Sequence, residues 1–353
     1  MKSAVLTGLR QLRIREEPKP ILRHPEDVLI RIDTVGVCGS DVHYYTTGRI
    51  GSQVVQYPYS VGHECAGTIL EIGAKVKHLK IGDRVAVEPA MSCGSCDQCL
   101  QGRHHTCRKL RFLGCPGQAD GSLKEYFLMP AECCFPIPNS MTLVQATLVE
   151  PLSIGIYAQR LAQIYSGAKI AILGAGPIGL SVLLAVRAET ESCTNYVTDL
   201  IDARLEVAKK CGADWTGVPT RQDIVADILQ REPLALDFVF ECAGQQETID
   251  QGIKLLKPGG TLLLIGIPEI NRISFDIDTL RRREIKIQNV RRQNGCVKTA
   301  IDLIADGKIN ADQMVTHHFS MDETQKAFDL VADYRDGVVK ALIHVAPQSM
   351  EQK

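Results

Sequence analysis

The hydrophobic pattern of the 353-residue chain changes character twice. From residue 1 to about residue 90, short apolar runs such as 3–6, 28–32 and 84–87 are separated by prolines and Gly-Asp turn signals. Closely spaced short runs predict a β-rich barrel or sandwich. From residue 153 to about residue 290, strand-like runs alternate with helical patterns, which predicts a parallel, doubly wound sheet.

The pattern becomes mixed again towards the end of the chain. Residues 285–290 predict an edge strand, residues 297–305 and 321–334 have the spacing of amphipathic helices, and residues 338–345 predict a further strand. The chain is therefore predicted to be an α/β protein in which a parallel sheet follows a β-rich segment.

Composition and charge exclude several classes of protein. Hydrophobic residues make up 45% and charged residues 23%, as in soluble globular chains. The net charge of −1 indicates neither a nucleic-acid partner nor an anionic membrane. Apolar runs such as Thr261–Ile267 are too short to span a bilayer, and Met1–Pro18 lacks a signal-peptide core. We therefore expect a cytoplasmic protein.

Four of the 13 cysteines form a compact motif, spaced C-x2-C-x2-C-x7-C: Cys93, Cys96, Cys99 and Cys107. Four thiolates in so short a lobe can close a tetrahedron with no open position, which is typical of structural zinc. An iron–sulfur cluster and redox disulfides are the competing interpretations. In a reducing compartment such a cluster indicates metal ligation, and the small polar lobe would need the metal to fold.

A second candidate metal site combines three ligand types. Cys38 precedes His63 and Glu64, and a thiol, an imidazole and a carboxylate would leave the fourth tetrahedral position free, as in a catalytic zinc site. Glu150 lies in an apolar neighbourhood directly before Pro151. A buried carboxylate needs a partner, because an unpaired charge is costly to bury. Glu150 either faces this metal, starts a helix or lies on the surface.

A dinucleotide fingerprint follows a predicted strand at residues 169–173. The sequence G-x-G-x-x-G, with a helical pattern after it, comprises Gly174, Gly176, Pro177, Ile178 and Gly179. The glycines permit a tight turn, a close approach of the backbone to a pyrophosphate, and close packing of helix on strand. The N-terminus of the helix then offers its free N–H groups to the phosphates.

Two residues bear on which dinucleotide binds. Asp199 ends the next predicted strand, 20 residues after Gly179, where a carboxylate can bind both hydroxyls of an adenosine ribose and would repel a 2′-phosphate. Arg204 lies one turn further on and could instead contact a 2′-phosphate. Because Asp199 ends the strand, NAD is favoured over NADP. The predicted cofactor site also includes Ile265, Ile267, Val290 and Arg292.

Taken together and in this order, these motifs resemble the zinc-containing medium-chain dehydrogenases over nearly the whole length of the chain. Within that family the chain is most similar to the polyol dehydrogenases, which act on sorbitol, L-iditol or xylitol. The residues that carry this closer match are Cys38–Tyr45, Gly62–Glu64, Glu88–Pro89, Phe112 and Glu150–Ser153.

The resemblance implies a Rossmann domain, residues 153–290, inserted into a GroES-like catalytic domain formed by residues 1–152 and 291–353. It also implies that Cys38, His63 and a carboxylate hold the catalytic zinc, with either Glu64 or Glu150 as the third ligand. Relatives are usually tetramers or dimers, which gives an expected homotetramer. They often carry a cis proline at the position of Pro58.

The resemblance further assigns roles around the zinc. Ser40 corresponds to the hydroxyl beside the bound alcohol, and His43 to the outer end of a proton relay that runs through the nicotinamide ribose. The residues that match substrate contacts are Tyr44, Phe112, Glu150 and Arg292. Gln293 departs from the Arg-Tyr pair of animal polyol enzymes, so the particular polyol stays open.

The predicted function is oxidation of a secondary alcohol of a polyol to a ketose, with NAD as hydride acceptor and with one catalytic and one structural zinc per chain. The competing enzymatic interpretation is oxidation of threonine, a butanediol or a simple secondary alcohol on the same fold. The competing interpretation outside enzymes is a structural protein that binds zinc and a nucleotide.

Overall fold

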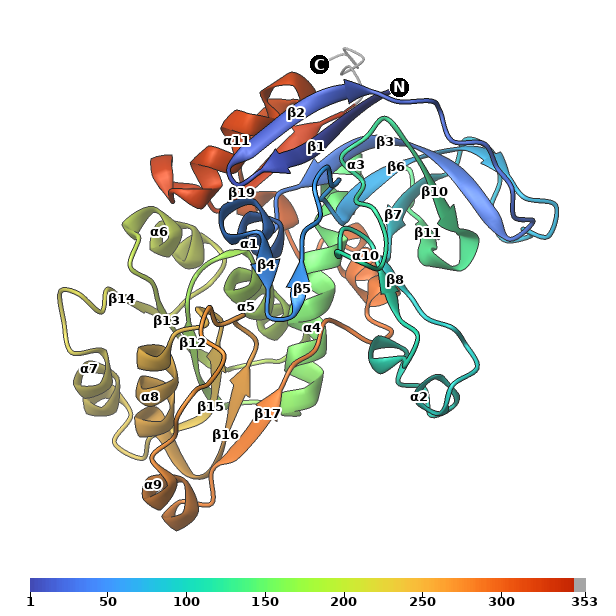
Figure 1. Cartoon of the computed structure of the whole chain (residues 1–353). Helices are drawn as coiled ribbons and strands as arrows, with labels where there is room; N and C mark the ends of the chain where they lie inside the picture. Colours follow the sequence, from blue (N-terminus) through green and yellow to red (C-terminus); the bar gives the residue numbers. More distant parts are fainter. Residues whose placement is uncertain (346–353) are drawn as a thin grey trace. The chain divides into compact units, whose positions relative to one another are not determined.

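The computed structural model describes residues 1–345, which divide into two compact units. The first unit contains Met1–Glu150, Val297–Gly307 and residues 315–345. The second contains Pro151–Cys296 and Lys308–Met314. Figure 1 shows that strands dominate the first unit and that strands and helices alternate in the second.

A seven-stranded sheet forms the centre of the first unit, with the order β11-β7-β6-β3-β19-β18 and with β10 also paired to β3. Only β18 and β19 pair in parallel; the other neighbours are antiparallel. The strands are β3 (Asp27–Gly36), β6 (Glu64–Ile72), β7 (Arg84–Val87), β10 (Tyr126–Pro130), β11 (Cys134–Pro136), β18 (Val315–Ser320) and β19 (Lys340–His344).

Short ribbons and helices surround this sheet. The ribbons pair β1 (Lys2–Gly8) with β2 (Gln11–Glu16), β4 (Arg49–Ile50) with β5 (Gln53–Val54), and β8 (Ala90–Met91) with β9 (Arg111–Phe112). The helices are α1 (Gly39–Thr47), α2 (Asp97–Leu100), α3 (Leu143–Thr147), α10 (Val297–Ala305) and α11 (Thr324–Ala332). The Tyr57–Pro58 peptide bond is cis, which confirms that prediction.

The second unit is built on a six-stranded parallel sheet with the order β14-β13-β12-β15-β16-β17. Its strands are β12 (Lys169–Leu173), β13 (Thr194–Thr198), β14 (Trp215–Gly217), β15 (Leu236–Glu241), β16 (Leu256–Leu264) and β17 (Lys286–Asn289). The helices between strands are α5 (Pro177–Glu189), α6 (Asp202–Lys210), α7 (Ile224–Arg231), α8 (Gln246–Leu255) and α9 (Ile277–Arg282). The predicted edge strand at residues 285–290 is confirmed as β17.

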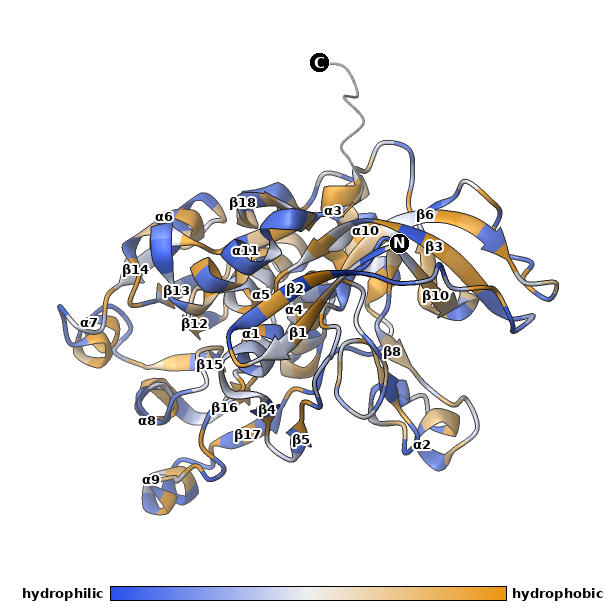
Figure 2. Cartoon of the chain, turned by 45° about the horizontal axis from the view of Figure 1, so that its top comes forward, coloured by the Kyte–Doolittle hydropathy of each residue, from blue (hydrophilic) through white to orange (hydrophobic). Residues whose placement is uncertain are grey.

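Burial explains why these segments form a parallel sheet. Strand β15 is buried along its whole length, as expected for a strand covered on both faces. Helices such as α7 and α9 present both hydrophobic and hydrophilic residues (Figure 2), so each can cover the sheet with one side and meet water with the other. The predicted fold class, a doubly wound Rossmann sheet inserted into a β-rich GroES-like domain, is confirmed by this topology and by the family matches reported below.

Helix α4 (Val149–Ala162) begins at the boundary between the units, and it places Glu150 at a helix start, which is one of the alternatives that the sequence left open. Helix α3 lies just before it, where Thr142 and Gln145 form a capping box. Helix α1 was not predicted from the sequence, because the segment after Cys38 was interpreted only by the chemistry of its side chains. It ends at Gly48, which has a left-handed backbone conformation with φ of 71°.

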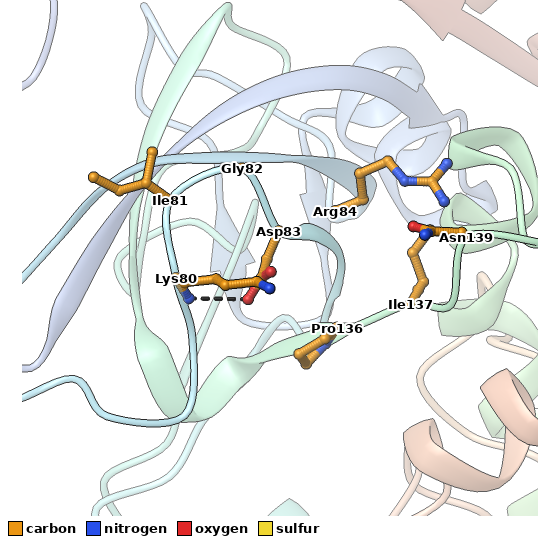
Figure 3. A pocket seen from close by; sticks show the side chains of 8 residues that line it. All are labelled: Lys80, Ile81, Gly82, Asp83, Arg84, Pro136, Ile137 and Asn139. Carbon is orange, nitrogen blue, oxygen red and sulfur yellow. Dashed lines mark hydrogen bonds between the residues drawn. The ribbon is translucent and has the colours of Figure 1, made fainter.

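Two surface features complete the description. A pocket in the first unit lies between the turn from β6 to β7 and the segment after β11; it is lined by Lys80–Arg84, Pro136, Ile137 and Asn139, and the Lys80 amide donates to Asp83 there (Figure 3). None of these residues belongs to the predicted site. Within residues 1–345, no helix combines the length and the apolar character that a membrane crossing requires.

Candidate active site

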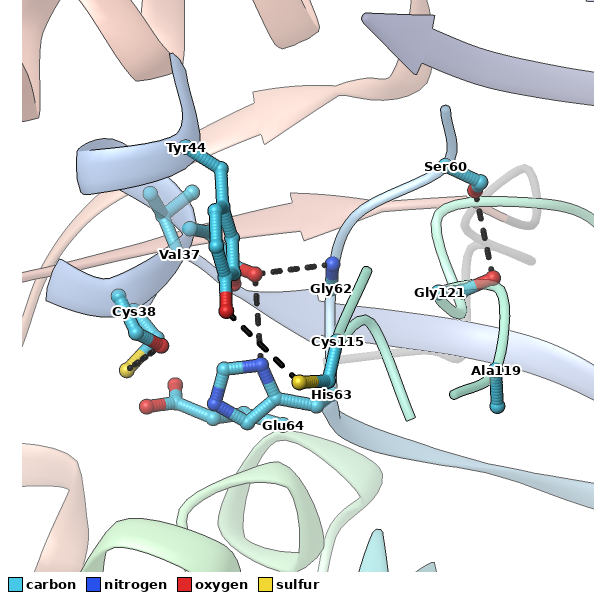
Figure 4. A network of polar contacts seen from close by, with 12 residues as sticks. Val37, Cys38, Tyr44, Ser60, Gly62, His63, Glu64, Cys115, Ala119 and Gly121 are labelled. Atoms are coloured by element: carbon cyan, nitrogen blue, oxygen red, sulfur yellow. Dashed lines mark hydrogen bonds and ion pairs between the residues drawn. The ribbon is translucent and has the colours of Figure 1, made fainter. Parts of the chain in front are cut away.

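The three ligands of the candidate catalytic metal come together in the first unit. Cys38 caps the N-terminus of α1, and His63 and Glu64 stand where strand β6 begins. One ligand atom from each lies within 4.8 Å of the others, and Figure 4 shows the three side chains pointing towards one another. His63 is 5% and Glu64 is 1% exposed. This donor set fits a zinc ion that keeps one position open.

A glycine makes room for the Glu64 carboxylate. Gly36 ends strand β3 and pairs with Glu64 across the sheet. A Cβ atom at Gly36 would lie 2.2 Å from Oε2 of Glu64, so any other residue there would push the carboxylate out of its place. The backbone of β3 therefore forms one wall of the metal site.

Asp41 orients His63, and sequence reasoning assigned it no role. Its Oδ1 lies 3.3 Å from Nδ1 of His63 and accepts a hydrogen bond of 3.2 Å from the Gly62 amide. A proton held on Nδ1 leaves Nε2 free for a metal. Burial lowers the pKa of His63. The Asp41 carboxylate and the Cys38 thiolate together raise this pKa by more than burial lowers it, so the net shift is upward. Asp41 follows Cys38 by three residues, and that proximity was the signal available in the sequence.

Lys340 is the second residue that sequence reasoning missed. Its ammonium donates to both oxygens of Glu64, at 2.8 and 2.6 Å, and to the Val37 carbonyl at 3.2 Å. Both side chains of this ion pair are 1% exposed. Burial lowers the pKa of Lys340. Glu64, together with Cys38 and Glu150, raises this pKa by more than burial lowers it, so the net shift is upward. A lone lysine within the apolar run 338–343, at the start of β19, was the signal.

Replacing Lys340 with methionine is expected to destabilise the metal-free protein by about 3–5 kcal/mol, because Glu64 would keep a buried charge without its partner. Bound zinc supplies positive charge beside Glu64, so the loss should be smaller in the zinc-loaded protein. Urea unfolding with and without zinc measures the difference. Lys340→Arg is the control that keeps the charge, and equal losses with and without zinc would contradict the expectation.

Glu150 is buried beside this group, in the first turn of α4. Its Oε2 has no hydrogen-bond partner. Burial raises the pKa of Glu150 to about 8, although His63 acts in the opposite direction. A buried carboxyl group with an unsatisfied oxygen favours a polar partner at that position, such as a ligand hydroxyl.

Four further residues predicted to surround the zinc also lie in the first unit, whereas Arg292 and Gln293 belong to the second. Ser40 donates to the Cys38 sulfur at 3.4 Å, and His43 lies one turn further along α1. Tyr44 is 4% exposed and contacts Gln53 at 3.1 Å and the Cys115 sulfur at 3.8 Å. Phe112 packs its ring against that of His63, with centroids 5.3 Å apart.

The four-cysteine lobe forms a closed ligand set. The sulfur atoms of Cys93, Cys96, Cys99 and Cys107 lie within 4.8 Å of one another, and two pairs are 3.6 and 3.9 Å apart. The edge of a ZnS4 tetrahedron is about 3.8 Å when each Zn–S bond is about 2.3 Å. All 13 cysteines are free, which contradicts the disulfide interpretation. A single tetrahedral ion therefore fits these thiols.

The polar surroundings of the lobe favour the thiolate of Cys93, whereas burial raises the pKa of Cys99 to about 11. Backbone amides of Cys93 and Lys109 each donate to the Cys107 sulfur at 3.3 Å. Hydrogen bonds, first from the backbone of Ser95, lower the pKa of Cys93 to about 6. Deprotonated sulfur is the form that binds metal.

The second unit places the glycine motif directly after β12. Gly174 has a φ of 106°, Gly176 caps α5 and Pro177 is its first residue. A Cβ at Gly179 would lie 1.9 Å from the Gly174 carbonyl oxygen, so only glycine fits there. The 13-residue helix α5 thus starts at a compact turn with its N–H groups available to a phosphate.

Asp199 closes this turn. Its Oδ2 accepts from the Ala175 amide at 2.8 Å and its Oδ1 from the Ile201 amide at 2.9 Å. Arg204, only 9% exposed, approaches Oδ2 to 3.9 Å. The same guanidinium would lie 3.8 Å from a Cβ at Gly176. Both residues proposed for the adenosine end of the cofactor therefore adjoin the glycine turn.

The other predicted cofactor residues follow neighbouring strands of the same sheet. Ile265 and Ile267 come after β16, while Val290 and Arg292 come after β17. Because the strands are parallel, their carboxyl ends share one edge of the sheet. Arg292 has a left-handed backbone, with φ of 53°, and Gln293 is buried and accepts from the Cys296 amide at 2.8 Å.

Comparison with known proteins agrees with this geometry. The profile of the alcohol dehydrogenase GroES-like domain matches residues 24–139, and that of the zinc-binding dehydrogenases matches residues 177–306. Sorbitol dehydrogenase of Bacillus subtilis is 36% identical over 98% of this chain and 97% of its own length. D-xylulose reductase A of Aspergillus oryzae is 33% identical over 92% of each chain.

Solved structures share the fold of this chain at somewhat lower sequence identity. An Escherichia coli oxidoreductase of unknown specificity has a TM-score of 0.93 and 31% identity, covering 98% of this chain and 99% of its own. A Sinorhizobium meliloti protein bound to NADP has a TM-score of 0.88 at 30% identity, and an E. coli alcohol dehydrogenase complexed with NADH has 0.87 at 28%; each covers 98% of this chain and 99% of its own. The chain belongs to the zinc-binding dehydrogenases, a family of alcohol dehydrogenases with a GroES-like domain.

Proposed function

We propose that the protein oxidises a secondary alcohol of a polyol, of the sorbitol, xylitol or L-iditol type, to a ketose and passes the hydride to NAD. The observation that carries this proposal is the buried group of Cys38, His63 and Glu64 with the partnerless carboxyl oxygen of Glu150 beside it. The names of the relatives, a sorbitol dehydrogenase and a xylulose reductase, support the same substrate class.

The residues of the first unit would divide the work as follows. Cys38, His63 and Glu64 would hold the zinc, with Asp41 and Lys340 keeping the imidazole and the carboxylate in place. When bound, the zinc ion supplies Lewis acidity and NAD accepts the hydride. Ser40 would receive the proton of the substrate hydroxyl. The relay would carry this proton through the nicotinamide ribose to His43, which would release it to water.

Substrate selection would rest on polar groups that bind hydroxyls, among them the Oε2 atom of Glu150, which a simple alcohol would leave without a partner. Glu150 and Tyr44 would hydrogen-bond hydroxyls next to the reacting carbon, and Phe112 would form an apolar wall. Arg292 and Gln293 are proposed to reach the far end of the polyol. A site built for hydroxyls rejects analogues that lack them, because its buried polar groups then lose their partners.

NAD is the proposed cofactor because of Asp199, although NADH and NADP each occur in a similar structure. The proposed contacts are the glycine turn (Gly174, Gly176, Pro177, Ile178 and Gly179), Asp199 with Arg204, and Ile265, Ile267, Val290 and Arg292. One zinc ion per chain would be catalytic, and one would stabilise the four-cysteine lobe.

Asp199→Ala is expected to raise the ratio of kcat/KM with NADP to that with NAD by about 10-fold to 100-fold, because it removes a charge that repels a 2′-phosphate and releases Arg204 to bind one. Initial rates with both cofactors measure the ratio. Arg204→Ala in the same background is the matched control and should remove the gain. Equal efficiency with both cofactors in the unmutated protein would contradict the proposed role of Asp199.

A direct test of the reaction is to incubate the zinc-loaded protein with NAD and a polyol and to measure NADH and ketose together. The proposal expects equal amounts of both products. NADH formed with threonine or butanediol but with no polyol would leave the fold assignment standing and refute the substrate class. Binding of zinc and NADH without turnover of any alcohol would favour a structural protein.

The proposed organisation is a cytoplasmic homotetramer. In the sequence of each chain, a Rossmann domain (153–290) is inserted between the two segments of a GroES-like domain (1–152 and 291–353). An edge strand supports oligomerisation: among residues 1–345, β17 pairs with β16 only, and most residues of β17 are exposed. Such an edge can pair with a second copy. Light scattering coupled to gel filtration measures the mass, and a monomer at micromolar concentration would refute the assembly.

A further inference from the structure

A buried carboxylate without an assigned role lies at the point where the second sheet changes direction. The chain adds β13 and β14 on one side of β12, and β15, β16 and β17 on the other, so the strand order reverses between β12 and β15. Doubly wound sheets bind ligands beyond the carboxyl ends of the strands at such a switch point. Glu241 is the last residue of β15 and is 1% exposed. It pairs with Leu173, the residue directly before the glycine turn.

Glu241 holds a turn at this edge. Its Oε1 accepts three hydrogen bonds: from the amide of Ala243 at 2.9 Å, the amide of Gly244 at 2.7 Å and the hydroxyl of Thr248 at 2.7 Å. Its main-chain carbonyl accepts from the amides of Ile265 and Gly266 at 2.9 and 3.0 Å. One residue therefore ties the turn 242–244 to the loop after β16.

The turn 242–244 is packed tightly on two sides. A Cβ at Gly174 would lie 3.1 Å from the Ala243 amide nitrogen, and one at Gly266 would lie 2.2 Å from that of Gly244. Gly244 has a φ of 73°, and its own Cβ would lie 2.7 Å from the Ile267 carbonyl oxygen. With so little space, any displacement of this turn must move its neighbours.

We propose that Glu241 is a positioning residue for the dinucleotide. By fixing the turn 242–244, it fixes the two segments that bracket the switch point: the glycine turn at Gly174 and the loop Ile265–Ile267. It acts through main-chain groups and requires no contact with the cofactor. The inference rests on the proposed binding of NAD to this unit.

The same strand supplies a matched control. Asp237 stands at the amino end of β15, is 8% exposed, accepts from the Lys169 amide at 2.7 Å and contacts Tyr165 and Lys257. It is therefore a buried, well-partnered carboxylate like Glu241, but at the opposite edge of the sheet. A purely structural carboxylate should affect stability from either end of the strand, whereas only Glu241 should affect cofactor binding.

The experiment compares Glu241→Ala, Glu241→Gln and Asp237→Asn in the full-length, zinc-loaded chain. NADH fluorescence titration gives Kd, and thermal unfolding without cofactor gives Tm. Glu241→Ala should weaken NADH binding about tenfold or more, since hydrogen bonds to a charged acceptor are lost. Glu241→Gln should restore Kd to within about threefold, because its amide oxygen still accepts. Asp237→Asn should lower Tm and leave Kd unchanged.

Turnover provides a second readout. Glu241→Ala should raise KM for NAD while kcat at saturating NAD stays close to that of the unmutated protein. If Glu241→Ala does not fold, Thr248→Val removes one donor to the same oxygen and should weaken NADH binding severalfold at little cost in Tm.

The outcomes separate the two proposals. If the unmutated protein binds NADH and the Glu241 and Thr248 variants bind it equally well, the positioning role is refuted and the proposed function stands. A loss of affinity in Asp237→Asn as large as that in Glu241→Ala also refutes it. If the unmutated protein binds no NADH, the proposed function and this inference are both wrong.

Discussion

Replacing Cys38 with serine, or His63 with alanine, is expected to lower kcat/KM for polyols by about a thousandfold or more, because a Lewis-acid metal supplies several kcal/mol of stabilisation to the developing charge. The protein should lose one zinc ion per chain and keep its fold. Cys38 caps α1 without a side-chain hydrogen bond, and serine is a favoured N-cap, so the helix should be retained.

Elemental analysis, circular dichroism and the rate of NADH formation together check this expectation. Cys134→Ser is the matched control, because Cys134 is a buried thiol in β11 of the same sheet and belongs to neither metal group. It should keep both zinc ions and full turnover. Full activity of a Cys38→Ser protein that lacks this metal would contradict the assignment.

Replacing Cys96 with serine should remove the other zinc ion and unfold the four-cysteine lobe. A closed set of four thiolates serves stability, and zinc contributes folding free energy on the order of 10 kcal/mol to small domains of this kind. The lobe offers little else to hold it, since Leu100 within α2 is 76% exposed. We expect rapid proteolysis within residues 93–107 and a loss of stability or assembly, with the ligands of the catalytic metal unchanged.

Zinc content, limited proteolysis and thermal unfolding measure these effects. Ser95→Ala is the control: it removes a hydroxyl that donates to the Cys93 sulfur at 3.7 Å but leaves all four thiols. It should keep both metals and resist proteolysis. Iron at this site, or no metal in the intact unmutated protein, would refute the assignment of structural zinc.

The sequence predicted best what is local along the chain. The glycine motif (residues 174–179) and the four-cysteine lobe (residues 93–107) are each one short continuous segment, so the spacing of their residues alone indicated their geometry. The parallel sheet was predicted because buried strands such as β12 are continuously apolar, here from Ile170 to Leu173, unlike the alternating strands of an exposed sheet. The amphipathic pattern at residues 297–305 likewise matched α10.

Long-range partners were not predictable in this way. Lys340 meets Glu64 from 276 residues away, and only the fold brings the starts of β19 and β6 close together, on either side of β3. Asp41 was visible in the sequence, but its contact with His63 depends on α1, a helix whose Gly39–Ser40 start gives a weak signal. Glu150 is the middle case: its apolar neighbourhood left open whether it faced the metal, started a helix or lay on the surface, and the structure buries it in the first turn of α4.

The most direct measurement is the ratio of kcat/KM for sorbitol, xylitol or L-iditol to that for 2-butanol, with the zinc-loaded protein and NAD. Because a simple alcohol would leave the buried Oε2 atom of Glu150 without a partner, we expect at least about a hundredfold preference for the best polyol. A protein that oxidises 2-butanol or threonine far better than every polyol tested would contradict the polyol assignment.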